Sequence, residues 1–227
     1  MSALRLYRGE MEPLPAEGRQ AFIRQDRRPR DTGKKLAFNI CFNLMIERHF
    51  GVPLIRRRSL FVCGDIRRVI RFAAAPDTRH IGVVEPIGHY RFLYASNVFD
   101  SAQIADDLTE RYLACFHPWQ RPLCSTLLKD ITLTLPKLEI FLAKHPEIDN
   151  GGFSWGATRL RDRLYDMLDG LKQSRTARTY CYTDTGLPSA IEKGVEIMLY
   201  DCPKGYHIKP IDSSELPQFK PNHHNEA

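Results

Sequence analysis

LYRG at residues 6–9 and VEIML at residues 195–199 are each typical of a short β-strand, and they lie almost a chain length apart. Each stretch presents one charged residue, Arg8 in the first and Glu196 in the second. Further strand signals occur on both sides of a helical middle, at 59–63, 81–86, 90–95, 179–182 and 206–208. This order predicts an α+β domain whose sheet is completed late in the chain.

Helical spacing of apolar residues predicts the longest early helix at residues 34–50, where Asp31 or Thr32 can cap its start. Asp65 can cap a second helix at 66–75. Later helical patterns occupy 106–116, 126–144 and 155–173. The two strands predicted at 81–86 and 90–95 either form a hairpin or follow one another without pairing.

The domain organisation predicted from this pattern is a single α+β domain over residues 1–211. It contains a mainly helical insert at about 101–178. Residues 212–227 are polar and rich in proline, so we expect a flexible tail there.

Composition fits a globular protein with a substantial core, because 43% of the 227 residues are hydrophobic. The net charge of +6 suits a ligand that carries phosphate, or a nucleic acid. No run approaches the roughly 20 apolar residues of a membrane helix, so no membrane partner is expected. The six cysteines include no C-x-x-C pair and no signal peptide is evident, which predicts free thiols and a cytoplasmic protein.

Common ligand motifs are missing from the sequence. It contains neither G-x-G-x-x-G nor G-x-x-x-x-G-K-[ST], so we expect neither a Rossmann nor a P-loop nucleotide site. The spacing of Cys115, His117 and Cys124 matches no common zinc pattern, and no metal site is predicted.

Three segments in this order resemble the Arg-Ser-Glu branch of the ADP-ribosyltransferase superfamily: LYRG at 6–9, FVCGD at 61–65 and VEIML at 195–199. In that family the first strand ends in an Arg followed by a small residue, a middle strand carries aromatic-x-Ser-Thr-Ser, and a late strand opens with the catalytic Glu. PRDT at 29–32 and the FVCGD segment are also similar to uncharacterised bacteriophage proteins that we group with this fold.

The resemblance implies a split, mostly antiparallel sheet with a helical insertion. It also implies NAD as the cofactor and transfer of ADP-ribose from NAD⁺ to a protein or nucleic-acid acceptor. For a phage-encoded chain, the setting would be the host cytoplasm or the virion.

The same resemblance implies roles for individual residues. Glu196 would accept a hydrogen bond from the ribose 2′-OH and stabilise the developing oxocarbenium ion. The planar donor fork of Arg8 suits a phosphate pair. Gly9 would let the backbone approach the nicotinamide ring. Cys63 would lie beneath the nicotinamide ribose and help to position Glu196.

An aromatic ring is also expected to stack on nicotinamide, and Tyr90, Phe92 and Tyr94 are the candidates. Two positions depart from the family pattern. Cys63 stands where the family has its first motif Ser, and a thiol is a weaker hydrogen-bond donor than a hydroxyl. Gly194 stands two residues before Glu196, where enzymes that modify arginine usually carry Glu or Gln; arginine is therefore disfavoured as the acceptor.

Two other functions stay open at this point. The chain can be a non-enzymatic module that binds nucleic acid or a protein, in which an arginine-rich segment contacts phosphates. That segment contains Arg24, Arg27, Arg28 and Arg30, and residues 56–58 form a second arginine cluster. The chain can also be a degenerate transferase fold that binds NAD without turnover.

Overall fold

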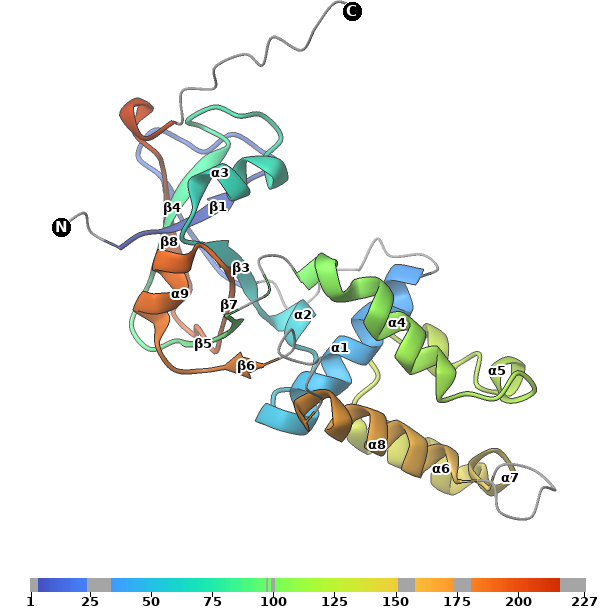
Figure 1. The fold of residues 1–227 in the computed structure, drawn as a ribbon. Helices are drawn as coiled ribbons and strands as arrows, with labels where there is room; N and C mark the ends of the chain where they lie inside the picture. Colours follow the sequence, from blue (N-terminus) through green and yellow to red (C-terminus); the bar gives the residue numbers. More distant parts are fainter. Residues whose placement is uncertain are drawn as a thin grey trace, which may run out of the picture.

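The computed structural model describes residues 4–23, 34–96, 98, 101–150, 158–173 and 181–216. Within these residues an eight-stranded antiparallel sheet forms one half of the molecule and a group of helices forms the other (Figure 1). The prediction of an α+β protein with an antiparallel sheet is confirmed.

The sheet brings early and late segments of the chain close together. Its strands are β1 (Leu6–Gly9), β2 (Arg19–Ala21), β3 (Leu60–Cys63), β4 (Ile81–Pro86), β5 (Arg91–Ala95), β6 (Tyr182–Thr183), β7 (Glu196–Tyr200) and β8 (Tyr206–Pro210). Their order is β2-β8-β4-β1-β3-β7-β5-β6, so only β3 separates β1 from β7. Strand β4 pairs with β1 and β8, whereas β5 pairs with β7 and β6, and the hairpin alternative for β4 and β5 is therefore wrong.

The helical half is built around the helix at 34–50, whose predicted bounds are confirmed. The helices are α1 (Lys34–Phe50), α2 (Ile55–Arg58), α3 (Ile66–Val69), α4 (Ala105–Ala114), α5 (Gln120–Leu123), α6 (Leu135–Lys144), α7 (Pro146–Asp149), α8 (Leu160–Gln173) and α9 (Leu187–Lys193). Short 3₁₀ helices include η1 (Ile70–Phe72), η2 (Ser101–Ile104), η3 (Leu127–Lys129) and η5 (Ser213–Glu215). Helix α9 and strand β2 were not expected from the sequence.

One apolar core joins the helices to the sheet. Phe42 and Leu44 of α1 are fully buried, and they share a cluster with Leu108 of α4 and Leu164 of α8. The same cluster reaches the sheet through Met198. Because α1 precedes β3, the helical half contains an early segment of the chain as well as the segment after residue 100.

The two faces of the sheet pack against different elements. Leu6, Val62 and Ile197 form a core with α9, and we call their side the α9 face. On the opposite side, which we call the α1 face, Tyr7 and Cys63 pack with α3, while residues farther along the sheet pack against α1. This division follows from the alternation of side chains along each strand.

The end of the described chain is fastened to β1. The Asp212 side chain accepts a hydrogen bond from the Ser214 backbone N–H and starts η5. The Glu215 carboxylate accepts hydrogen bonds from Arg5 at 2.6 Å and from the Tyr7 hydroxyl at 3.0 Å. Residues 212–216 therefore belong to the fold, and the tail predicted to begin at Asp212 does not begin there. Residues 217–227 of that predicted tail lie outside the described residues.

Candidate functional site

Cys63 and Glu196 lie directly opposite each other on β3 and β7. On the other edge of β3, Cys63 is opposite Tyr7 of β1. Directly opposed residues of antiparallel strands project from the same face of a sheet. Tyr7, Cys63 and Glu196 therefore form one row across three neighbouring strands on the α1 face.

The Cys63 thiol fastens the end of β3 to the turn that precedes β7. Its Sγ lies 3.2 Å from the Gly194 carbonyl oxygen, to which it donates, and accepts from the Asp65 backbone N–H at 3.3 Å. The residue is buried, and burial raises the pKa of the thiol. Cys63 is therefore protonated at neutral pH, and it acts here as a hydrogen-bond donor.

Gly194 ends α9 in the left-handed backbone region, at φ 60°. A Cβ atom added there would lie 2.6 Å from the Asp65 Cβ atom. Glycine avoids both the backbone strain and this contact. Packing therefore accounts for the absence of a Glu or Gln side chain two residues before Glu196.

The Glu196 side chain is half-buried, and its Oε1 accepts a hydrogen bond from the Ser101 backbone N–H at 3.2 Å. The Ser101 hydroxyl oxygen in turn accepts a hydrogen bond from Arg56 Nη1 at 2.6 Å. Arg56, rather than Arg8, is thus linked to the carboxylate through one intervening residue. The sequence placed Arg56 only within a cluster of three arginines, and Ser101 carried no signal at all.

Arg8 does not share a face with Glu196. It follows Tyr7 on β1, so its side chain projects toward the α9 face. Its guanidinium donates to the Phe61 carbonyl oxygen at 3.1 Å and to Glu10 at 2.5 Å. The prediction that Arg8 and Glu196 line a common cavity is wrong, because neighbouring residues of a strand alternate between faces.

The space beside Gly9 is filled by the chain itself. A Cβ atom added to Gly9 would lie 2.7 Å from both the Ala73 nitrogen and the Phe72 carbonyl carbon. The missing side chain therefore lets the end of η1 pack against β1. The expected approach of a nicotinamide ring to Gly9 is not compatible with this packing on the side where a Cβ atom would lie.

The aromatic candidates also lie on the wrong face. Phe92 is opposite Leu199 and Tyr94 is opposite Ile197, so both rings project to the α9 face. Their centroids are 6.4 Å apart in a stacked arrangement. Tyr90 packs against the same α9-face core. The prediction that Phe92 or Tyr90 stacks on a ring held beside Glu196 is therefore wrong.

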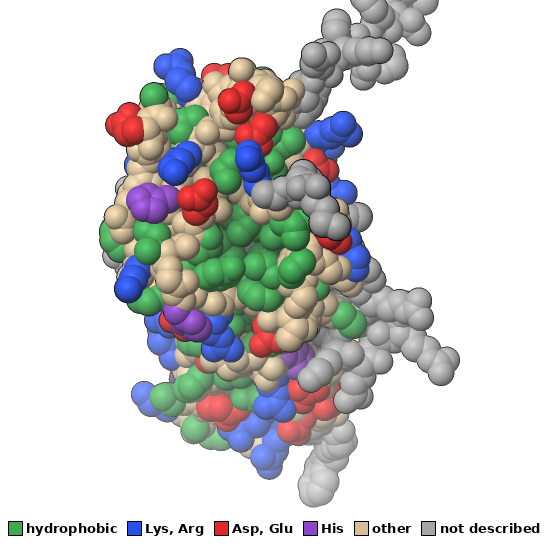
Figure 2. Space-filling view, turned by 90° about the vertical axis from the view of Figure 1, so that its left-hand side faces the viewer, with side chains coloured by type: hydrophobic (Ala, Val, Ile, Leu, Met, Phe, Trp, Pro, Cys, Tyr) green, Lys and Arg blue, Asp and Glu red, His purple; other side chains and the backbone are tan. Residues whose placement is uncertain are grey.

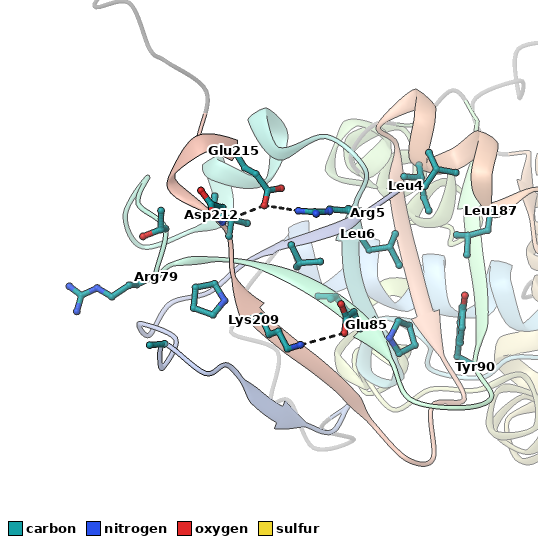
Figure 3. A pocket seen from close by; sticks show the side chains of 18 residues that line it. Leu4, Arg5, Leu6, Arg79, Glu85, Tyr90, Leu187, Lys209, Asp212 and Glu215 are labelled. Atoms are coloured by element: carbon teal, nitrogen blue, oxygen red, sulfur yellow. Dashed lines mark hydrogen bonds and ion pairs between the residues drawn. The ribbon is translucent and has the colours of Figure 1, made fainter. Parts of the chain in front are cut away.

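A cavity of about 980 Å³ opens beside β4, β8 and α9 (Figure 3). Apolar side chains including Leu6, Tyr90 and Leu187 line it, and ion pairs such as Lys209–Glu85 lie among its other lining residues. Figure 2 shows hydrophobic side chains gathered on this side of the sheet half, with charged side chains around them. Neither Cys63 nor Glu196 lines the cavity.

Two further expectations concern the rest of the chain. Arg24, Arg27, Arg28 and Arg30, expected to contact nucleic acid, lie outside the described residues. In the part of the chain that the structure describes, no helix has the length and apolar character needed to cross a membrane.

The same part of the chain contains no group of three or more His, Cys, Asp or Glu side chains placed to hold a metal ion.

Comparisons of the chain with protein-family models, with curated proteins and with solved structures found no match.

Proposed function

We propose that this protein is an NAD-dependent transferase of the ADP-ribosyltransferase type, with Glu196 as its catalytic residue. The observation that carries the proposal is the direct opposition of Cys63 and Glu196 on the paired strands β3 and β7, of which β3 also pairs with β1. The three segments that resemble the family are distant in sequence, and here they occupy three neighbouring strands.

The proposed reaction breaks the bond between the nicotinamide nitrogen and ribose C1′, and the electron pair leaves with nicotinamide. The Glu196 carboxylate stabilises the positive charge that develops on the ribose. A nucleophile of a macromolecular acceptor then bonds to C1′ and loses its proton. Cys63 does not attack the ribose in this scheme, because its buried thiol is protonated at neutral pH.

Arg8 has no part in NAD⁺ binding in this proposal, since its side chain is held by Glu10 and by the Phe61 carbonyl oxygen. The proposal also gives no role to Gly9, Tyr90 or Phe92, since the Cβ side of Gly9 is filled by η1 and both rings pack on the α9 face. Of the residues to which the resemblance assigned a role, the proposal keeps Glu196 as the catalytic residue and Cys63 as the residue opposite it.

The test uses NAD⁺ labelled in its adenylate part and a wide panel of protein and nucleic-acid acceptors. Glu196→Gln should lower labelling on the order of 10²–10³-fold, because it removes the preorganised charge. Glu192→Gln is the matched control, since this exposed glutamate lies on α9 four residues earlier. It should label acceptors as the wild type does.

Equal labelling by wild type and Glu196→Gln, or no labelling of any acceptor, would contradict the enzymatic proposal. Calorimetry then separates the remaining possibilities. NAD⁺ binding without turnover would indicate a degenerate transferase fold. Salt-sensitive binding of DNA or RNA without NAD⁺ binding would indicate a nucleic-acid-binding module.

A further inference from the structure

The backbone at Arg56 is held in place by a strained turn and a buried polar contact. Leu54 precedes α2 in the left-handed region, at φ 55° and ψ 38°, which costs a residue with a Cβ atom roughly 1–2 kcal/mol. The Asn43 side chain, 1% exposed within α1, accepts the Arg56 backbone N–H at 3.1 Å. Such strain persists only where the surroundings enforce it, and it often marks a functional position.

Aromatic rings hold the Arg56 guanidinium. Its central carbon lies 4.8 Å from the Phe38 ring centroid, 5.5 Å from that of Phe42 and 5.1 Å from that of Phe61. Cation–π contacts of this kind orient a guanidinium without neutralising it. Arg56 takes part in none of the ion pairs found among the described residues.

Ser101 connects this guanidinium to the proposed catalytic carboxylate. Its hydroxyl accepts from Arg56 Nη1 and its backbone N–H donates to Glu196 Oε1. Ser101 itself is only 1% exposed, and both hydrogen bonds are partly buried. The hydroxyl and the amide belong to one residue, so the two contacts hold Ser101 between Arg56 and Glu196.

We propose that Arg56 is a positioning residue for Glu196, which acts by fixing Ser101 so that its backbone N–H holds the carboxylate. The inference rests on the proposed function of Glu196. It assigns to Arg56 a role that the sequence resemblance gave to no residue, and it requires no contact between Arg56 and NAD⁺.

Amide hydrogen exchange at Ser101, followed by NMR, tests the contact without any need for turnover. Arg56→Ala should speed exchange of the Ser101 amide at least tenfold, which corresponds to about 1.4 kcal/mol. Arg58→Ala, a change of the exposed arginine at the end of the same helix, should leave that rate unchanged. An unchanged Ser101 rate in Arg56→Ala would overturn the inference.

Steady-state kinetics tests the consequence for Glu196. Arg56→Ala should lower kcat on the order of 10²-fold, the loss expected when a reacting group is misplaced by about 1 Å, with KM for NAD⁺ within about twofold of wild type. Ser101→Ala should lower kcat in the same direction, and the double variant should be no slower than the slower single variant. Arg56→Lys, which keeps the positive charge and can still donate to the Ser101 hydroxyl, should recover part of kcat.

A raised KM with an intact kcat would overturn the inference in favour of direct substrate binding, and additive losses would overturn it in favour of independent roles. If Glu196→Gln loses turnover while Arg56→Ala keeps it, the proposed function stands and this inference fails. If the wild type shows no turnover, the proposed function fails and the Ser101 exchange rate still decides whether Arg56 fixes the residue that holds Glu196.

Discussion

The two faces of the sheet differ in what they offer a ligand. The α1 face carries a row of polar side chains, with Cys63 opposite Glu196 and Arg56 linked to that carboxylate through Ser101. The α9 face carries an apolar core and a cavity of about 980 Å³ beside it. The strand residues that line the cavity belong to β1, β4 and β8, whereas Cys63 and Glu196 lie on β3 and β7 and do not line it.

Neighbouring residues on one strand make this difference concrete. On β7, Glu196 belongs to the polar row and Ile197 to the α9-face core. On β1, Tyr7 belongs to the row, whereas Arg8 projects to the other side. The adjacency of two strands is consequently not sufficient to place two side chains in one site, since the alternation along each strand must also match.

The largest expected effect concerns the core of the α9 face. Ile197→Ala removes a fully buried side chain, and it should lower the free energy of unfolding by about 3 kcal/mol, measured by urea denaturation. Leu4→Ala is the control, because Leu4 lines the cavity but is 48% exposed; it should cost no more than about 0.5 kcal/mol. Similar losses in the two variants would mean that the cavity wall is packed as tightly as the core.

Gly9→Ala tests whether position 9 requires glycine for packing on the α1 face or for the binding of a ligand. The added Cβ atom meets backbone atoms of residues 69–73, so we expect a loss of about 2 kcal/mol in unfolding free energy. Gly170→Ala, in α8 with nothing within 4 Å of the added atom, should instead stabilise the protein by about 0.5–1 kcal/mol. A Gly9→Ala variant of normal stability that fails to bind NAD⁺ would restore the ligand role that the packing excludes.

The Tyr7 hydroxyl should make a contribution to the free energy of unfolding that depends on pH. Burial, followed by the hydrogen bond to Glu215, raises the pKa of Tyr7, so the folded state favours the neutral phenol. Tyr7→Phe should cost about 1 kcal/mol of unfolding free energy at pH 7. Because the folded pKa lies above that of the unfolded chain, about 10, this difference should persist below pH 10 and shrink as the pH rises further. A constant difference up to pH 11 would contradict the assignment.

Tyr90→Ala should have the smallest effect on catalysis. Tyr90 packs on the α9 face, so we expect kcat and KM for NAD⁺ to stay within about twofold of wild type in the labelling assay. Glu196→Gln, assayed beside it, provides the comparison on the other face. A tenfold rise in KM for Tyr90→Ala would place the nicotinamide in the apolar cavity.

Local patterns in the sequence were enough to locate the main elements. Apolar residues at helical spacing gave α1 its bounds, and short apolar runs located β3, β4 and β7. Strand β2 has three residues and α9 has seven, and elements this short carry too little periodicity to be recognised. Local sequence patterns do not report which distant strands pair, and the sequence therefore could not identify the partners of β4 and β5.

The candidate site was predictable only in part, because the sequence reveals individual strands but not the register and packing that bring their residues together. Cys63 and Glu196 each lie at the end of a recognisable strand, and the register of β3 with β7 places them opposite each other. The face that Arg8 occupies depends on the register between β1 and β3, which a shift of one residue would reverse. Ser101 and Arg56 reach Glu196 only through the packing of the helical half on the sheet, and no motif in their own segments reports that packing.

Titration of the ¹⁵N-labelled protein with NAD⁺, followed by amide chemical shifts, is the most direct test of which face holds the ligand. The account predicts that the largest changes occur at Cys63, Glu196 and Ser101 on the α1 face, with little change at Tyr90 and Leu187 around the cavity. Changes concentrated at Tyr90 and Leu187, or no change at Glu196 at saturating NAD⁺, would contradict it.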